Sequence, residues 1–90
     1  MKQIEAIVSG KVQGVSFRMH AQRKAQQLGV KGYVKNLSNG DVEIVAVGEV
    51  AAIDASIEWA KTGSPSAIVK NIGVKTITNT EYFADFTIRR

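Results

Sequence analysis

Cysteine is absent from the 90-residue sequence, so the chain forms no disulfide and offers no thiolate as a nucleophile or metal ligand. This absence fits a reducing compartment, and we expect a cytoplasmic protein. Residues 1–5 lack the long apolar core of a signal peptide, and no apolar run approaches the roughly 20 residues of a membrane helix. We therefore expect no association with a membrane.

Clusters of Asp, Glu and His at metal-ligand spacing are also absent, and we expect neither a metal nor another cofactor. The only histidine, His20, has no carboxylate at a spacing suited to acid–base catalysis, so we expect it to lie at the surface. The acidic residues Asp41 and Glu43 fall on a predicted hairpin, where we expect a solvated or structural role.

The composition that remains is that of a globular protein, with 44% hydrophobic and 22% charged residues. Residues 1–90 are predicted to form a single domain, since a chain of this length can bury one core. The net charge of +4 at pH 7 suits an anionic partner. Lysine and arginine are scattered rather than clustered, which favours a small anion over a nucleic acid. No feature indicates an obligate protein partner, so we expect a monomer.

Hydrophobic periodicity divides the chain into strands and helices. Phe17, Ala21, Ala25 and Leu28 recur at the helical period, and Gly29 follows at a position suited to a helix end. Alternating apolar residues and turn residues predict the strands. The predicted helices are residues 17–28 and 50–61, and the predicted strands are residues 4–9, 30–36, 41–48, 67–76 and 83–89.

This order of elements, β-α-β-β-α-β plus a final strand, is typical of an α+β protein with a ferredoxin-like α/β sandwich. We expect a mainly antiparallel sheet with two helices on one face. A polar turn at residues 78–81 is predicted to lead into the last strand. The apolar positions that alternate there are Tyr82, Ala84, Phe86 and Ile88.

The loop between the first strand and the first helix has the composition of an anion-binding site. Gly10 and Gly14 lie four residues apart, which lets backbone N–H groups converge where a Cβ would obstruct them. The start of the helix adds unpaired N–H groups and the positive end of its dipole, and Ser16 is placed to cap it. Arg18, in the first helical turn, supplies a planar set of donors suited to phosphate oxygens. The stretch therefore predicts a site for a small dianion.

Two motifs resemble the signatures of the acylphosphatase family. The resemblance extends over about residues 4–89, and the two motifs lie at the family's spacing. They are Gly10-x-Val12-Gln13-Gly14-Val15-x-Phe17-Arg18 and Gly32-Tyr33-Val34-x-Asn36-x-x-Asn39-Gly40-x-Val42-Glu43.

The resemblance implies a metal-independent enzyme that hydrolyses the carboxyl-phosphate bond of acyl phosphates to a carboxylate and inorganic phosphate. It implies that Arg18 and Asn36 are the catalytic residues, with Arg18 binding the phosphoryl oxygens and the Asn36 amide positioning the attacking water. It also implies that backbone N–H groups of the loop surround the phosphoryl group. The loop residues concerned are Lys11, Val12, Gln13, Gly14 and Val15.

The chemistry of an acyl phosphate is compatible with so few functional groups. The substrate is a mixed anhydride, and its leaving group is a carboxylate, which departs without being protonated first. Phosphoryl transfer through a loose transition state depends mainly on placement and charge stabilisation. A guanidinium, a set of N–H donors and one amide that orients water are therefore sufficient.

Two other classes of protein share this order of elements. An RNA recognition module needs aromatic residues on its third strand, but residues 41–48 contain no aromatic residue and two acidic ones. A ferredoxin-like domain that binds a ligand without catalysis is the second alternative. The presence of both Arg18 and Asn36 argues against it.

Overall fold

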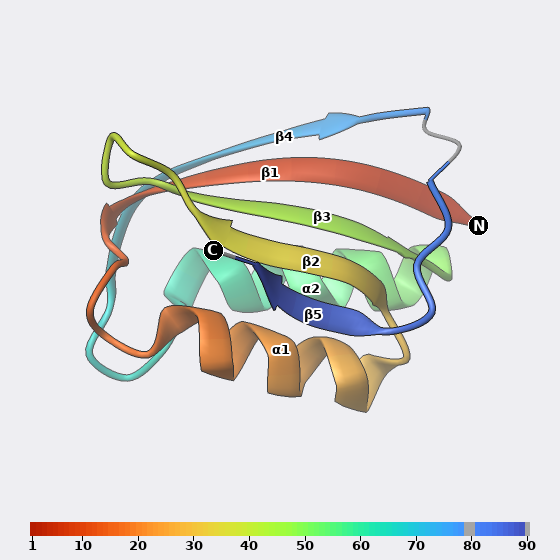
Figure 1. Cartoon of the computed structure of the whole chain (residues 1–90), viewed down its shortest axis with the longest axis horizontal. Helices are drawn as coiled ribbons and strands as arrows, with labels where there is room; N and C mark the ends of the chain where they lie inside the picture. Colours follow the sequence, from red (N-terminus) through yellow and green to blue (C-terminus); the bar gives the residue numbers. More distant parts are fainter. Residues whose placement is uncertain (79–80, 90) are drawn as a thin grey trace.

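The computed structural model describes residues 1–78 and 81–89. Within these ranges, five strands form one sheet in the order β4-β1-β3-β2-β5, and all neighbouring strands are antiparallel except β2 and β5, which are parallel. Both helices cover the same face of the sheet (Figure 1). The predicted α+β, ferredoxin-like architecture is thus confirmed. The elements are β1 (Lys2–Lys11), α1 (Phe17–Leu28), β2 (Lys31–Asn36), β3 (Val42–Gly48), α2 (Val50–Thr62), β4 (Ile68–Thr76) and β5 (Phe86–Arg89).

The directions of the strands bring three strand ends together. β1 and β2 each run antiparallel to β3, which lies between them, so they point the same way, and β5 is parallel to β2. The carboxyl ends of β1, β2 and β5 therefore meet at one end of the sheet, where α1 begins (Figure 1). Asn36 ends β2 there, and Ile88 lies near the end of β5.

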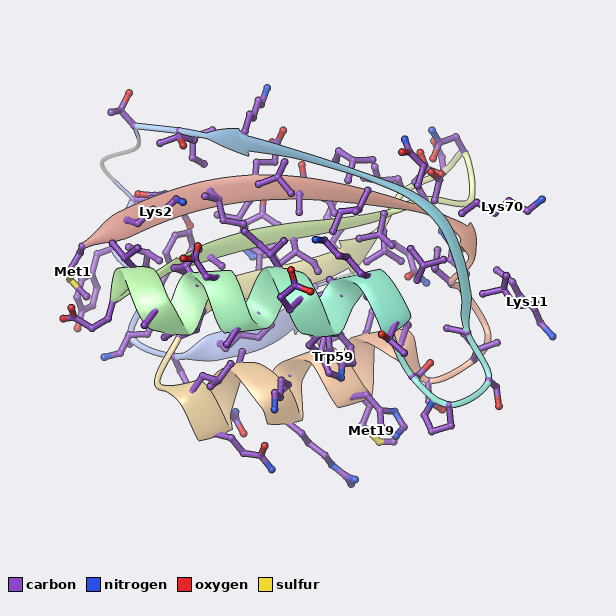
Figure 2. The ribbon with its side chains drawn as sticks, turned by 180° about the vertical axis from the view of Figure 1, so that it is seen from behind. Met1, Lys2, Lys11, Met19, Trp59 and Lys70 are labelled. Atoms are coloured by element: carbon purple, nitrogen blue, oxygen red, sulfur yellow. The ribbon has the colours of Figure 1, made fainter. Side chains whose placement is uncertain are left out.

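The core lies between the helices and the sheet. Trp59 of α2 is half-buried and packs against Phe17 of α1, with ring centroids 5.2 Å apart, where the two helices lie side by side (Figure 2). The period predicted for the first helix is confirmed, because its apolar positions face the core. The residues that the two helices bury are Phe17, Ala21, Ala25, Ile53 and Ala60.

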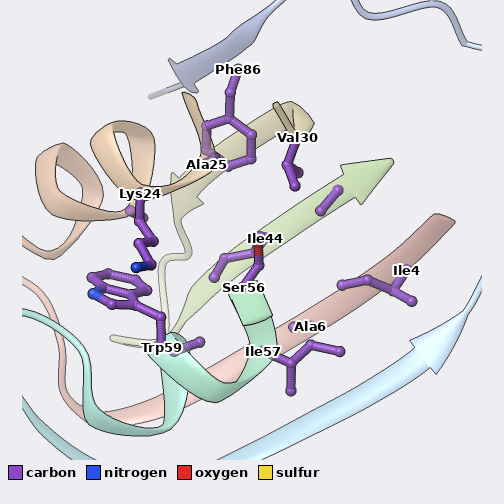
Figure 3. A pocket seen from close by; sticks show the side chains of 13 residues that line it. Ile4, Ala6, Lys24, Ala25, Val30, Ile44, Ser56, Ile57, Trp59 and Phe86 are labelled. Atoms are coloured by element: carbon purple, nitrogen blue, oxygen red, sulfur yellow. The ribbon is translucent and has the colours of Figure 1, made fainter. Parts of the chain in front are cut away.

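A small cavity of about 20 Å³ remains inside this core (Figure 3). Its wall is almost wholly apolar and includes Ile44, Trp59 and Phe86. A space of this size holds about one water-sized sphere. The cavity therefore has no room for a substrate.

The last strand is shorter than predicted. It begins at Phe86, because the Asp85 carboxylate accepts a hydrogen bond from the Phe86 N–H while the Asp85 carbonyl accepts one from Gly32. The predicted alternation is wrong before this point: Tyr82 is 83% exposed and Ala84 is exposed, whereas Phe83 is buried. The predicted turn at residues 78–81 includes residues 79 and 80, which lie outside the described residues.

Candidate functional site

An open cleft of about 390 Å³ lies where the three strand ends meet the start of α1. It is formed by residues of the loop after β1, the first turn of α1 and the ends of β2 and β5. These residues are Val12, Gln13, Gly14, Ser16, Phe17, Arg18, Met19, Asn36 and Ile88. The cleft thus combines both sequence motifs with the C-terminal strand.

The loop presents a series of unpaired backbone donors. None of the hydrogen bonds formed by the described residues uses a backbone N–H of residues 12–16 as its donor. Gly14 and Ser16 have φ angles of +72° and +59°, which is the left-handed region. For Ser16 this conformation costs about 1–3 kcal/mol. Together with the N-terminus of α1, these donors make a positive, concave surface suited to an oxyanion.

The loop begins later than predicted, because β1 continues to Lys11. Gly10 lies in this strand at a bulge, and a Cβ there would collide with the carbonyl oxygen of Ile68 in β4. Gly10 therefore permits the close pairing of β1 with β4 rather than the approach of an anion. Gly14 alone serves the loop conformation.

Two of the predicted loop residues do not line the cleft. Lys11 is exposed, pairs with Ile68 in the β1–β4 ladder and carries its side chain outward (Figure 2). Val15 packs against the core, and its carbonyl accepts a hydrogen bond of 2.8 Å from the Ser64 hydroxyl. The structure therefore brings Val12, Gln13 and Gly14 into the cleft.

Ser16 occupies the position before α1, but its side chain does not cap the helix. A side-chain cap requires an extended backbone, which the left-handed φ of Ser16 precludes. The Ser16 carbonyl instead accepts hydrogen bonds from the backbone N–H of His20 (3.2 Å) and from the His20 ring at Nδ1 (2.8 Å). Since a carbonyl only accepts, Nδ1 carries the proton. His20 therefore supports the loop from outside the cleft.

Arg18 keeps most of its donors free. Its Nη1 donates to the Arg89 carbonyl at 3.2 Å, and no carboxylate pairs with its guanidinium within the described residues. A guanidinium has five N–H donors, so the other four remain for a ligand. The contact with β5 orients the side chain while leaving its positive charge uncompensated.

Asn36 carries the least satisfied side chain at the site. Its Oδ1 is buried and has no hydrogen-bond partner among the described residues. An unpaired buried acceptor costs about 1–3 kcal/mol. Such a group, in a cleft that free N–H donors also line, is suited to accept a hydrogen bond from a ligand or from water.

The Gln13 side chain joins the loop to the hairpin that follows Asn36. Its Nε2 donates to the Leu37 carbonyl and to the Asp41 carbonyl, each at 2.8 Å. The same carbonyls close the turn, accepting from Gly40 N–H (3.2 Å) and Leu37 N–H (2.8 Å) respectively. Both amide hydrogens of Gln13 are thus used, which ties the loop to the segment that holds Asn36. Sequence reasoning missed this role, because it arises only when β1 and β2, on either side of β3, end at the same edge of the sheet.

The C-terminal strand is held by a cluster on the uncovered face of the sheet. The Arg89 guanidinium lies 4.0 Å from the centre of the Tyr33 ring and bonds to Glu81 at 2.9 Å, while the Tyr33 hydroxyl donates to Glu43 at 3.0 Å. Burial, followed by the hydrogen bond to Glu43, raises the pKa of Tyr33 from 10.0 to about 12. These contacts give Tyr33 and Glu43 structural roles and fix the carbonyl that binds Arg18.

The described part of the chain has neither a metal-binding cluster nor a membrane-spanning helix. Residues 1–78 and 81–89 contain no group of three or more His, Cys, Asp or Glu side chains placed to hold a metal ion. No helix in these ranges is long and apolar enough to cross a membrane.

Comparison with known proteins identifies the relatives of this chain. The acylphosphatase family model matches residues 4–88. An acylphosphatase from Methylococcus capsulatus is 41% identical over 90 residues, covering 100% of this chain and 98% of the relative. One from Coxiella burnetii is 49% identical over 86 residues, covering 96% and 90%. The crystal structure of acylphosphatase from Bacillus subtilis superposes with a TM-score of 0.95 at 39% identity, covering 100% of both chains. The predicted family resemblance is confirmed.

Proposed function

The chain belongs to the acylphosphatase family, whose reaction is the hydrolysis of acyl phosphates to a carboxylate and inorganic phosphate, and we propose that its cleft performs this reaction with Arg18 and Asn36 as catalytic residues. The observation that carries the proposal is the unpaired Oδ1 of Asn36, which lines the same cleft as Arg18 and the unpaired loop donors.

The phosphoryl group is bound by the loop and by Arg18. Backbone N–H groups of Val12, Gln13, Gly14 and Val15 donate to its oxygens, and the guanidinium of Arg18 adds charge-assisted hydrogen bonds. Lys11, whose backbone pairs with β4, begins this loop and does not line the cleft. This arrangement stabilises the negative charge that the phosphoryl oxygens carry in the transition state.

Asn36 orients the nucleophile. Its Oδ1 accepts a hydrogen bond from water and directs the water oxygen at phosphorus. The new P–O bond forms as the bond to the acyl oxygen breaks, and the carboxylate leaves with the electron pair. The neutral amide does not take a proton, so both water protons end on the phosphate, which leaves as H2PO4⁻. The reaction therefore needs no general acid.

A steady-state assay tests the proposed function directly. Purified protein is given benzoyl phosphate with and without EDTA, and a phosphate monoester in a parallel reaction. We expect hydrolysis of benzoyl phosphate that is insensitive to EDTA, competitive inhibition by inorganic phosphate, and no turnover of the monoester. Hydrolysis that stops with EDTA, or equal turnover of the monoester, would contradict the mechanism.

The setting of the enzyme is part of the proposal. Residues 1–90 act as a single acylphosphatase domain and as a monomer in the cytoplasm, binding neither nucleic acid nor membranes. The lack of cysteine and the scattered basic residues support this setting. Light scattering of the purified protein measures the mass, and a mass above 9.7 kDa by a whole multiple would contradict the monomer.

A further inference from the structure

Ser64 is buried beside the loop that lines the cleft. It lies in the connection between α2 and β4, which runs beside the loop after β1 (Figure 1). Ser64 is 2% exposed, and no other polar or charged residue in the described part of the chain is as deeply buried. Its hydroxyl donates to the Val15 carbonyl at 2.8 Å, across 49 residues of sequence. The two segments also approach closely at Gly63, where a Cβ would lie 2.9 Å from the Phe17 ring.

The bond from Ser64 fixes the direction of the peptide group between Val15 and Ser16. In a trans peptide, the carbonyl and the N–H point in opposite directions. The Val15 carbonyl faces Ser64, which does not line the cleft. The Ser16 N–H is therefore directed to the opposite side, and Ser16 lines the cleft there. This N–H has no partner among the described residues, so it is available to an anion.

The backbone angles of Ser16 oppose this orientation of the peptide group. The φ of Ser16 is +59°, a left-handed value that is unfavourable for a residue with a Cβ. Rotation of the Val15–Ser16 peptide by half a turn would bring this φ to about −120°, in the broad β region. The same rotation would replace the N–H in the cleft with a carbonyl oxygen, which only accepts hydrogen bonds and repels phosphate oxygens. Ser64 opposes the rotation, and no other donor among the described residues binds the Val15 carbonyl.

We propose that Ser64 is a positioning residue of the phosphate site, which holds the Val15–Ser16 peptide with its N–H toward the phosphoryl group. The proposal rests on the proposed function, which places the phosphoryl group against this loop. Ser64 itself does not contact the substrate. The next carbonyl along the chain, that of Ser16, accepts from both the backbone N–H and the ring of His20, so it keeps one donor if the other is removed. The Val15 carbonyl has no such second donor, and its direction depends on Ser64.

The test compares Ser64→Ala with two control variants. Ser66→Ala removes an exposed hydroxyl from the same connection. Ile53→Val removes a buried methylene from α2, which lowers stability at a site that does not line the cleft. Calorimetric titration gives the dissociation constant of inorganic phosphate for each folded protein, and benzoyl phosphate gives kcat/KM. The Ser16 amide resonance in ¹H–¹⁵N spectra reports on the N–H itself.

We expect Ser64→Ala to bind phosphate about tenfold more weakly and to lose about 10- to 100-fold in kcat/KM, because one donor to the phosphoryl oxygens is lost. Phosphate should shift the Ser16 amide resonance of the wild type and leave that of Ser64→Ala nearly unchanged. Both controls should bind phosphate as the wild type does. Adding Ser16→Gly to Ser64→Ala should restore part of the affinity, since glycine adopts a positive φ as readily as a negative one.

A Ser64→Ala protein that is less stable but binds phosphate as tightly as the wild type would overturn the positioning role. An equal loss of phosphate affinity in Ile53→Val would do the same, as would a wild-type Ser16 amide that does not respond to phosphate. If Ser64→Ala does not fold, Ser64→Cys takes its place, because a thiol is a weak donor of similar shape. Failure of the proposed function is a separate result, since a wild-type protein that hydrolyses no acyl phosphate would contradict it whatever the Ser64 variants do.

Discussion

The polar cluster around Tyr33 and the cleft that holds Asn36 differ in their hydrogen bonding. The polar groups of the cluster are paired with one another, whereas those of the cleft are not. In the cluster on the uncovered face of the sheet, Tyr33 bonds to Glu43 and Arg89 bonds to Glu81. In the cleft, the Asn36 Oδ1 and the backbone donors of residues 12–16 have no partner among the described residues. Arg89 takes part in both regions, since its side chain belongs to the cluster and its carbonyl orients Arg18.

This difference in hydrogen bonding indicates that the cluster contributes to stability and that the cleft contributes to function. Paired polar groups hold β5 in place, and each hydrogen bond contributes about 0.5–1.5 kcal/mol. Unpaired groups in the cleft lower stability and remain available to a ligand. Substitutions in the cluster should therefore change the free energy of unfolding and spare turnover, whereas substitutions in the cleft should do the reverse.

Arg18→Ala should have the largest effect on activity. Removing the guanidinium takes away charge-assisted donors to the phosphoryl oxygens, which we expect to lower kcat/KM for benzoyl phosphate about 10³-fold. Inhibition by inorganic phosphate should weaken in parallel. Arg23→Ala is the control, because Arg23 is exposed on the same helix. Near-normal turnover of Arg18→Ala would remove Arg18 from the catalytic residues.

Gln13→Glu should have a smaller effect than Arg18→Ala. The isosteric carboxylate replaces both amide donors with an acceptor that faces the carbonyls of Leu37 and Asp41. We expect the hairpin to shift and kcat to fall about 10- to 100-fold, since a small misplacement of a catalytic group is costly. Gln13→Met, which removes the donors without adding charge, should lose less. Wild-type kcat in Gln13→Glu would show that the link does not position Asn36.

Tyr33→Phe should change stability rather than activity. The ring packing against Arg89 and Phe83 remains, and the hydrogen bond to Glu43 is lost, at a cost of about 1 kcal/mol in the free energy of unfolding. Denaturant titration measures this cost, and kcat should stay at the wild-type value. Tyr82→Phe, at a site that is 83% exposed, provides the control. A loss of kcat without a loss of stability would break the division between the two regions.

The smallest effect concerns alkaline pH. In the unfolded chain Tyr33 loses its proton near its ordinary pKa of 10.0, but the folded protein holds it until about 12. Between these values the unfolded state binds fewer protons, so the Tyr33 contribution to stability is present below pH 10 and declines as the pH rises toward 12. Comparison of wild type with Tyr33→Phe isolates this term. Parallel stability curves above pH 10 would show that the pKa of Tyr33 is not raised.

Much of the fold could be predicted because local patterns determine it. The spacing from Phe17 to Leu28 predicted the bounds of α1, and Asn39-Gly40 predicted the hairpin. The last strand could not be placed, because Tyr82 and Phe83 fit either phase of an alternating strand. Only the contacts of Asp85 with Gly32 and Phe86 show where pairing with β2 begins.

The candidate site also has features that local sequence patterns predict and features that they do not. Arg18 and Asn36 lie in recognisable motifs, so the sequence predicts them as candidate catalytic residues, and both line the cleft. Gly10 was misinterpreted, because its close neighbour in β4 is almost 60 residues away in the chain. The bridging role of Gln13 and the exposure of Ile88 likewise depend on strand directions, which no local pattern records.

The most direct test of the separate roles of Asn36 and Arg18 uses the variant Asn36→Ala. Its kcat for benzoyl phosphate and its dissociation constant for inorganic phosphate are measured on the same preparation. Asn71→Ala in β4 is the control. If the loop and Arg18 bind phosphate while Asn36 orients water, kcat falls by about 100-fold or more and phosphate binding stays within about twofold of wild type. A variant that keeps its turnover, or that folds but loses phosphate binding, would contradict this division of roles.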